Sequence, residues 1–154
     1  MLFAPGDYKL DIPIGYYTQV LGLAACKAAP SPDPFKKELK NFGQWFISER
    51  FDEQWSMDTL MVALAVAKKA EPEMSVVARL AELCPKYPAQ CVTSLRLMIE
   101  GDREGWFLMG VENDAQRLLR GALQSNNPDG VLAARRLIEE LIAKGQFGFR
   151  QLLN

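Results

Sequence analysis

The sequence contains no histidine. This absence excludes Ser-His-Asp and Cys-His catalytic sites and every zinc or iron centre that needs a histidine ligand. A glycine-rich phosphate loop is missing as well, because Gly105 lies between Gly101 and Gly110 but no Gly-Lys-Ser/Thr follows. We therefore expect a protein that is not an enzyme and that uses no cofactor and no metal.

Cysteine is scarce, with only Cys26, Cys84 and Cys91 in the chain. An odd number of dispersed cysteines forms neither a secreted disulfide framework nor a zinc site. A bridge between Cys84 and Cys91 is geometrically conceivable, since both flank a pair of prolines. Reduced, partly buried thiols are the expectation we prefer.

Long apolar runs are also lacking. The longest, residues 60–67, stops at Lys68 and Lys69, well short of the roughly 18–20 residues of a membrane helix. The first residues show no basic start followed by an apolar stretch, so they do not form a signal peptide. We expect a cytoplasmic protein with no membrane contact.

The chain contains 18 basic and 19 acidic residues, so neither sign of charge dominates. Dedicated nucleic-acid binders usually have a basic surface, so we do not expect nucleic acid as the partner. The signs are unevenly spread: 12 basic and 16 acidic residues precede Ala115, whereas 6 basic and 3 acidic residues follow from there. A basic tail end suits an acidic partner, although such an imbalance more often reflects a solvated face.

The length of 154 residues and the 49% of hydrophobic residues predict a single domain, 1–154, with a core of its own. Residues 1–13 form an irregular lead-in, and 14–28 a first helix with apolar residues at helical spacing. The break at 30–34 contains three prolines, which remove amide donors and restrict the residues before them.

Start and stop signals divide the rest of the chain into helices. Helices are expected to begin at Pro34, after Asp52 or Ser56, at Pro72, at Pro88, near Val111 and at Asn127-Pro128. Gly145 ends the last one, and Phe147 to Leu153 fold back as a short cap. The inward face of the helix that begins at Asn127-Pro128 is predicted to contain Val131, Leu132, Ala134, Leu137, Ile138, Leu141 and Ile142.

No segment alternates as a strand would, and short turns between helices imply antiparallel neighbours. The predicted fold class is therefore all-α, with antiparallel helix pairs stacked as a short HEAT-like array or as an irregular helical bundle.

Three stretches carry a family resemblance: Phe42 to Trp55 (FGQWFISERFDEQW), Ile99 to Trp106 (IEGDREGW) and Gly145 to Leu153 (GQFGFRQLL). They resemble the HEAT-like carboxy-terminal region of large bacterial proteins, several of which carry an NTPase or other effector domain, some in loci suspected of phage defence. The resemblance covers roughly two-thirds of the chain. It implies a helical scaffold that recognises or braces a partner and has no catalytic residues. Because no effector domain precedes the helices here, we expect either a free-standing relative or a piece of something larger.

An acidic connection precedes and enters the helix expected near Val111. Its carboxylates are Glu100, Asp102, Glu104, Glu112 and Asp114. Oxygen ligands of this kind suit magnesium, but the spacing matches no calcium loop, so a solvated acidic segment is the better interpretation. Trp106 lies in the same connection. We expect it to fill the gap between adjacent helix pairs, and if exposed it would be a binding hot spot.

Two further groups are candidates for binding. Residues that could contact a partner are Arg103, Trp106, Arg117, Arg120, Arg135 and Arg136. Arg117 and Arg120 are neighbours on one helix face, whereas the packing that would bring the other two arginines to them is not fixed by the sequence. Aromatic residues that could line a ligand cavity are Phe42, Trp45, Phe46 and Trp55, although an aromatic stripe at helical spacing is more often core.

These observations favour a non-catalytic protein-interaction or scaffold module with a protein partner or self-association. The alternatives are a small-molecule-binding helical protein with an aromatic cavity, and a weak nucleic-acid accessory that uses the C-terminal arginines.

Overall fold

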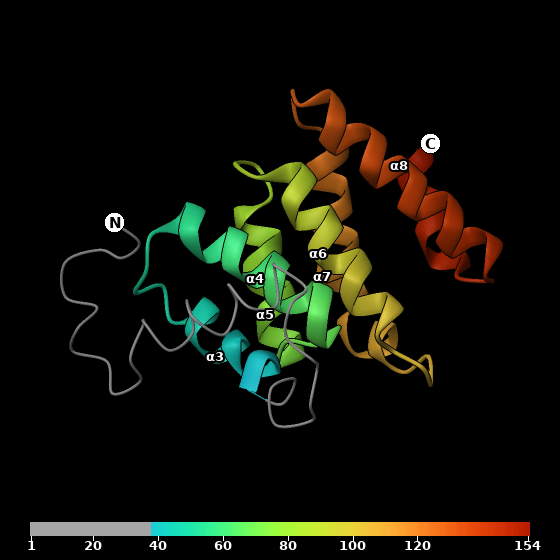
Figure 1. Cartoon of the computed structure of the whole chain (residues 1–154). Coiled ribbons are helices and arrows are strands. Elements are labelled where there is room, and N and C mark those ends of the chain that lie inside the picture. Colours follow the sequence, from blue (N-terminus) through green and yellow to red (C-terminus); the bar gives the residue numbers. More distant parts are fainter. Residues whose placement is uncertain (1–37) are drawn as a thin grey trace. The chain divides into compact units, whose positions relative to one another are not determined.

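The computed structural model describes residues 38–154, and this part of the chain is all-α, as predicted (Figure 1). The predicted lead-in 1–13, the helix 14–28, the proline break 30–34 and Cys26 lie outside the described residues. The elements are α3 (Phe42–Ile47), α4 (Glu53–Ala67), α5 (Glu73–Leu83), α6 (Pro88–Glu100), α7 (Phe107–Leu123), α8 (Pro128–Ala143) and the 3-10 helix η2 (Phe147–Leu153).

The chain divides into two compact units, Met1–Val76 and Val77–Asn154, whereas the sequence was interpreted as one domain. The boundary falls inside α5, between Val76 and Val77. Both of these side chains are buried, as the apolar spacing of this helix predicts.

In the first unit, a side chain caps the start of α4 by accepting a hydrogen bond from a backbone N–H that has no partner within the helix. Asp52 Oδ1 accepts a hydrogen bond from the backbone N–H of Trp55 at 2.9 Å, so Asp52 rather than Ser56 is the cap. The helix ends at Ala67, and Lys68 follows in the left-handed conformation with φ of 60°. A close backbone approach joins the start of α3 to the loop between α4 and α5: the Glu71 N–H donates to the Lys40 carbonyl at 2.8 Å, and Gly43 faces the Glu71 backbone with no room for a Cβ.

In the second unit, proline and asparagine mark the helix starts. Pro88 occupies the first turn of α6 and Pro128 that of α8, where the missing amide costs nothing. Asn127 Oδ1 accepts hydrogen bonds from the N–H groups of Asp129 at 2.9 Å and Gly130 at 3.2 Å. The predicted starts at Pro88 and Asn127-Pro128 are therefore confirmed.

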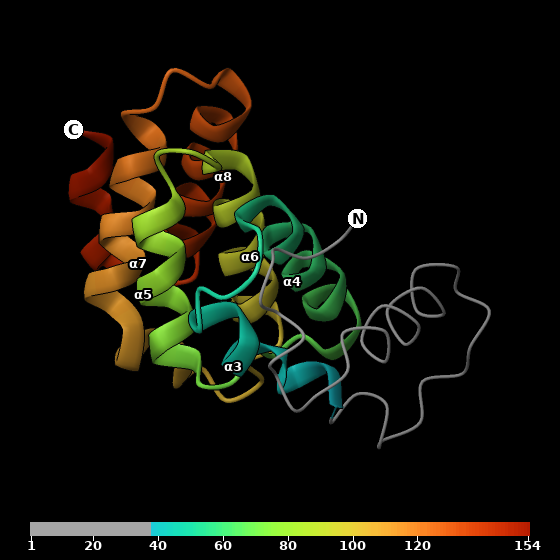
Figure 2. The same cartoon turned by 90° about the vertical axis from the view of Figure 1, so that its left-hand side faces the viewer.

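The helices α6, α7 and α8 pack against one another (Figure 2). The last residues before α6 and α8 meet the turn after α7 at one groove, so α6 and α8 start at the same end and α7 ends there. Thus α7 runs antiparallel to both neighbours. An ion pair between Arg96 of α6 and Glu140 of α8 spans the parallel pair, and Gly130 lets the start of α8 approach Pro88 closely.

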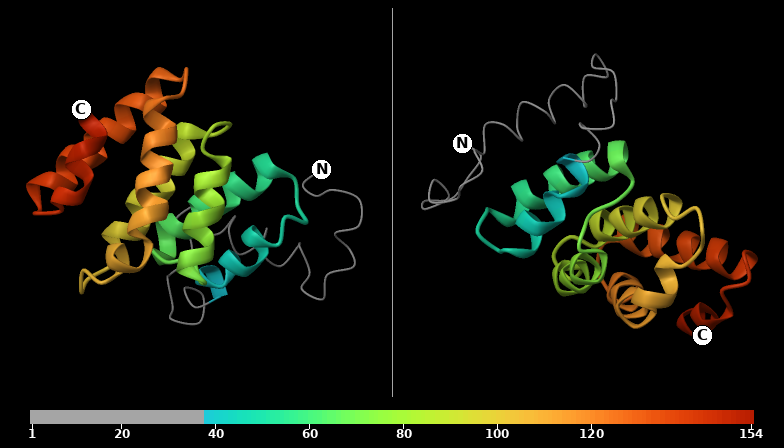
Figure 3. Two further views of the ribbon diagram at one scale, coloured as in Figure 1. Left: turned by 180° about the vertical axis from the view of Figure 1, so that it is seen from behind. Right: turned by 90° about the horizontal axis from the view of Figure 1, so that it is seen from below.

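The chain ends in a segment that folds back, as predicted. Gly145 leaves α8 with φ of 91°, a conformation that glycine adopts without strain. η2 then packs on α8 and contacts α7, and the chain end lies beside these helices (Figure 3). Phe149 is its anchor, since only 1% of this side chain is exposed.

Two details of the sequence interpretation are wrong. α7 begins at Phe107, four residues before the expected start near Val111, because Asp102 supplies a cap that the pattern did not reveal. Leu132 was placed in the inward stripe of α8 but is 48% exposed. Four other predicted members of the stripe are confirmed as buried: Ala134, Leu137, Ile138 and Leu141.

Candidate functional site

The start of α7 is held by a capped turn. Asp102 Oδ2 accepts a hydrogen bond from the backbone N–H of Phe107 at 2.7 Å, which satisfies one of the orphan donors at this helix end. Gly105 has φ of 78° and closes the turn in a conformation that favours glycine. Trp106 lies between Gly105 and Phe107, so the backbone on both sides of it has a defined conformation.

Trp106 is 65% exposed, and Met109, one helical turn later, is 71% exposed. The interpretation of Trp106 as a plug between helix pairs is wrong. Phe107 and Leu108 fill the core at this point, with 8% and 7% exposure, so Trp106 is left on the outer side. We call Trp106, Met109 and Gly110 the Trp106 face. A Cβ added at Gly110 would meet no atom within 4 Å, so the surface is open there.

The neighbouring carboxylates have different partners. Glu100 pairs with Arg96 at 3.7 Å and Asp114 with Arg117 at 3.2 Å, while Asp102 caps α7. Glu112 accepts a hydrogen bond from Gln116 at 3.3 Å and keeps its charge exposed. Within residues 38–154, no three potential metal-ligating side chains come together as a site.

The four C-terminal arginines are all exposed, with Arg117 and Arg120 on α7 and Arg135 and Arg136 on α8. Arg117 pairs with Asp114 and donates to the Ala78 carbonyl of α5 at 3.3 Å. Arg136 lies one turn before Glu140, which pairs with Arg96 of α6. Arg103, the other arginine with an expected role, is exposed in the turn that precedes Trp106.

The aromatic residues of the first unit form a packed cluster. Phe42 and Phe46 are buried at 1% and 2% exposure, and Trp45 and Trp55 are half-buried. Ring centroids of Trp55 lie 5.9 Å from Phe42 and 5.2 Å from Phe51, the tilted and edge-on arrangements that aromatic pairs prefer. This geometry favours the core interpretation over a ligand cavity.

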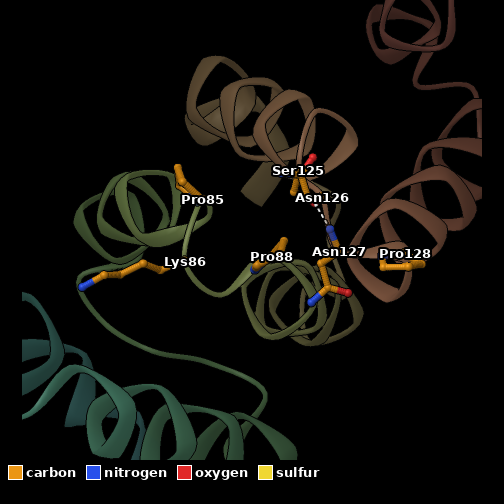
Figure 4. Close-up of a pocket in the computed structure, with 7 residues that line it drawn as sticks. All are labelled: Pro85, Lys86, Pro88, Ser125, Asn126, Asn127 and Pro128. Carbon is orange, nitrogen blue, oxygen red and sulfur yellow. Dashed lines mark hydrogen bonds between the residues drawn. The ribbon is translucent and has the colours of Figure 1, made fainter.

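An open groove of about 480 Å³ lies at the opposite end of α7 (Figure 4). Its lining residues are Pro85, Lys86, Pro88, Ser125, Asn126, Asn127 and Pro128. In the sequence, the prolines and Asn127 mark only helix boundaries, and their turns are the one signal that could have indicated a common surface.

Cys84 and Cys91 are free and buried. The Cys84 thiol donates to the Leu118 carbonyl at 3.2 Å. Hydrogen bonding with Cys84, together with burial, raises the pKa of the Cys91 thiol well above its ordinary value. The same hydrogen bond lowers the pKa of the Cys84 thiol. Both thiols are nevertheless buried, and a reactive cysteine needs access to solvent as well as a lowered pKa, so we interpret both as structural.

The described residues are all-α and present the Trp106 face at the capped start of α7. None of the helices within 38–154 has the length and apolar character that crossing a membrane requires. Comparison with protein-family models, curated proteins and solved structures gives no match.

Proposed function

We propose that the chain is a non-catalytic protein-interaction module, a HEAT-like scaffold of a bacterial cytoplasm, which binds a protein partner through the Trp106 face. The observation that carries this proposal is the exposure of Trp106 and Met109 side by side on a fixed helix start. Tryptophan is enriched among the residues that dominate binding energy at protein interfaces.

The contacts that hold the start of α7 support the proposal. The Asp102 cap and the burial of Phe107 hold the first turn of α7 in place. An apolar side chain presented from an ordered backbone loses little conformational entropy on binding, so more of its burial energy contributes to affinity. The absence of histidine from the whole chain accords with a binding role.

A site-specific photo-crosslinking experiment tests this function. Benzoylphenylalanine replaces Met109 in the full chain, which is then irradiated in lysate of the source cells. We expect a single protein to be crosslinked in stoichiometric amounts, and the crosslink to be lost when Trp106→Ser is added. Benzoylphenylalanine at Leu132, an exposed apolar position on α8, is the matched control. No crosslink at Met109, or equal crosslinking from both positions, would refute the interaction module.

A further inference from the structure

The outer face of α7 is covered along part of its length and bare along the rest. η2 covers the middle of the helix: Gln116 Nε2 donates to the Gly148 carbonyl at 3.1 Å, and the Gln151 side chain donates to Gln116 Oε1 at 3.4 Å. Residues three and four apart share a helix face, so Met109 lies one turn before Glu112 and nearly two turns before Gln116. The Trp106 face is therefore the uncovered continuation of a surface that already accepts a short helical segment.

The shape of the bare stretch suits a second segment. Gly110 has no side chain, and a Cβ there would point into open space. A partner backbone can therefore approach α7 closely between Met109 and the exposed Asn113. Phe147, at the near end of η2, is 61% exposed, and the Arg150 guanidinium lies over its ring, 5.2 Å from the centroid. The apolar contact is therefore expected at Trp106 and Met109 rather than at Phe147.

Two exposed carboxylates flank the Trp106 face. Glu104 is exposed two residues before Trp106, and Glu112 is exposed one turn after Met109. Arg103 is the one basic residue between Glu100 and Asp114, so it offsets only part of this charge. Complementary charge steers association and selects partners. Glu104 and Glu112 favour a positive partner beside Trp106 and Met109, whereas Arg150 supplies positive charge at the Phe147 end.

We propose that the Trp106 face docks a basic amphipathic segment of the partner protein, with an apolar side chain against Trp106 and Met109 and lysine or arginine toward Glu104 and Glu112. This inference rests on the proposed function and narrows the partner to one chemical class. The docked segment lies along α7 beyond the amino-terminal end of η2, in the mode by which amphipathic helices lie in apolar grooves.

Two synthetic peptides test the partner class. Both are amphipathic 14-residue helices with leucine at the same positions. One carries lysine and the other glutamate at every polar position. Binding of each fluorescently labelled peptide to the full chain is measured by anisotropy at low and at moderate salt. We expect the lysine peptide to bind at least ten-fold more tightly than the glutamate peptide, and to bind less tightly as salt rises.

Four variants locate the binding. Trp106→Ser and Glu104→Lys are each expected to weaken the lysine peptide about ten-fold. Leu132→Ser removes another exposed apolar side chain, and Glu139→Lys reverses another exposed charge, both on α8. These controls are expected to leave the affinity unchanged. Circular dichroism of every variant confirms that it is folded.

Several results would overturn the proposal. Equal affinity for the two peptides, no binding of either, or equal losses in test and control variants each exclude a specific basic segment. A dimer in native mass spectrometry that Trp106→Ser dissociates, without peptide binding, would show that a second copy occupies the face. A crosslink from position 109 within the same chain would assign the face to the chain's own residues.

The interaction module and the basic-segment inference can be refuted by different results. If position 109 crosslinks to a partner whose contacting segment is neutral or acidic, the basic-segment inference is wrong and the interaction module stands. If position 109 crosslinks to nothing and the lysine peptide does not bind, both are wrong.

Discussion

The Gln116 side chain donates a hydrogen bond to the Gly148 carbonyl at 3.1 Å and so ties the closing 3-10 helix to the middle of α7. Polar contacts of this kind fix the register of η2 but contribute little energy when exposed. The energy comes from the buried side of η2, which packs on α8 and contacts α7 and where Phe149 is 1% exposed.

The first prediction concerns this anchor. Phe149→Ala removes a side chain that is 1% exposed, and we expect it to lower the free energy of unfolding by about 3–5 kcal/mol. The matched control is Phe147→Ala, two residues earlier and 61% exposed, for which we expect a change within about 0.5 kcal/mol. Urea denaturation followed by circular dichroism measures both. Similar losses would mean that η2 is not docked through Phe149.

The second prediction concerns the start of α8. Asn127→Ala removes the acceptor for two backbone N–H groups and should lower the free energy of unfolding by about 1 kcal/mol. Asn126→Ala alters the preceding exposed asparagine and should be close to neutral. Thermal unfolding of the pair compares them directly, and a larger loss at Asn126 would contradict the capping role of Asn127.

Proline and asparagine also explain why so much of the fold could be predicted. Pro88, Pro128 and Asn127 act through local backbone chemistry, which the sequence displays directly, and the starts of α6 and α8 follow from them. The all-α fold class and the closing segment after Gly145 could be predicted because they too follow from local patterns in the sequence. The start of α7 was not, because its cap comes from Asp102, five residues before the amide that it satisfies, outside the usual capping spacing.

Only part of the candidate site could be predicted from the sequence. Trp106 was recognised as a residue of interest, but its burial depends on whether its neighbours fill the core first. Phe107 and Leu108 do so, and tertiary competition of this kind leaves no periodic signal. The packing of Arg117 against Ala78 of α5, away from α8, was likewise beyond the reach of helix periodicity.

The third prediction compares two glycines that the sequence does not distinguish. A Cβ at Gly43 would collide with the backbone of Glu71, whereas one at Gly110 would meet nothing. Gly43→Ala should therefore destabilise the chain by about 2 kcal/mol or more. Gly110→Ala should stabilise it by about 0.5–1 kcal/mol, because alanine is the better helix former. Denaturant titration of the two variants tests the opposite signs, and a neutral Gly43→Ala would refute the close approach of α3 to Glu71.

The last prediction concerns alkaline pH and the buried thiols. Hydrogen bonding with Cys84 and burial raise the pKa of Cys91, so folded Cys91 keeps a proton that the unfolded chain releases above about pH 8.5. The same hydrogen bond lowers the pKa of Cys84, and this opposite contribution stops changing once Cys84 has lost its proton in the unfolded chain as well. At a pH well above about 8.5, Cys84 is deprotonated in both states, whereas Cys91 binds a proton only in the folded state, so stability declines as the pH rises further.

The measurement is the free energy of unfolding between pH 7.5 and 9.5, in the wild-type chain and in Cys84→Ala/Cys91→Ala. The wild type should lose up to about 1 kcal/mol per pH unit at the upper end of this range, and the double variant should lose distinctly less. Cys26 is present in both proteins and cancels in the comparison. Parallel slopes would show that these thiols do not hold their protons through the fold, because cavity formation in the variant lowers stability equally at every pH.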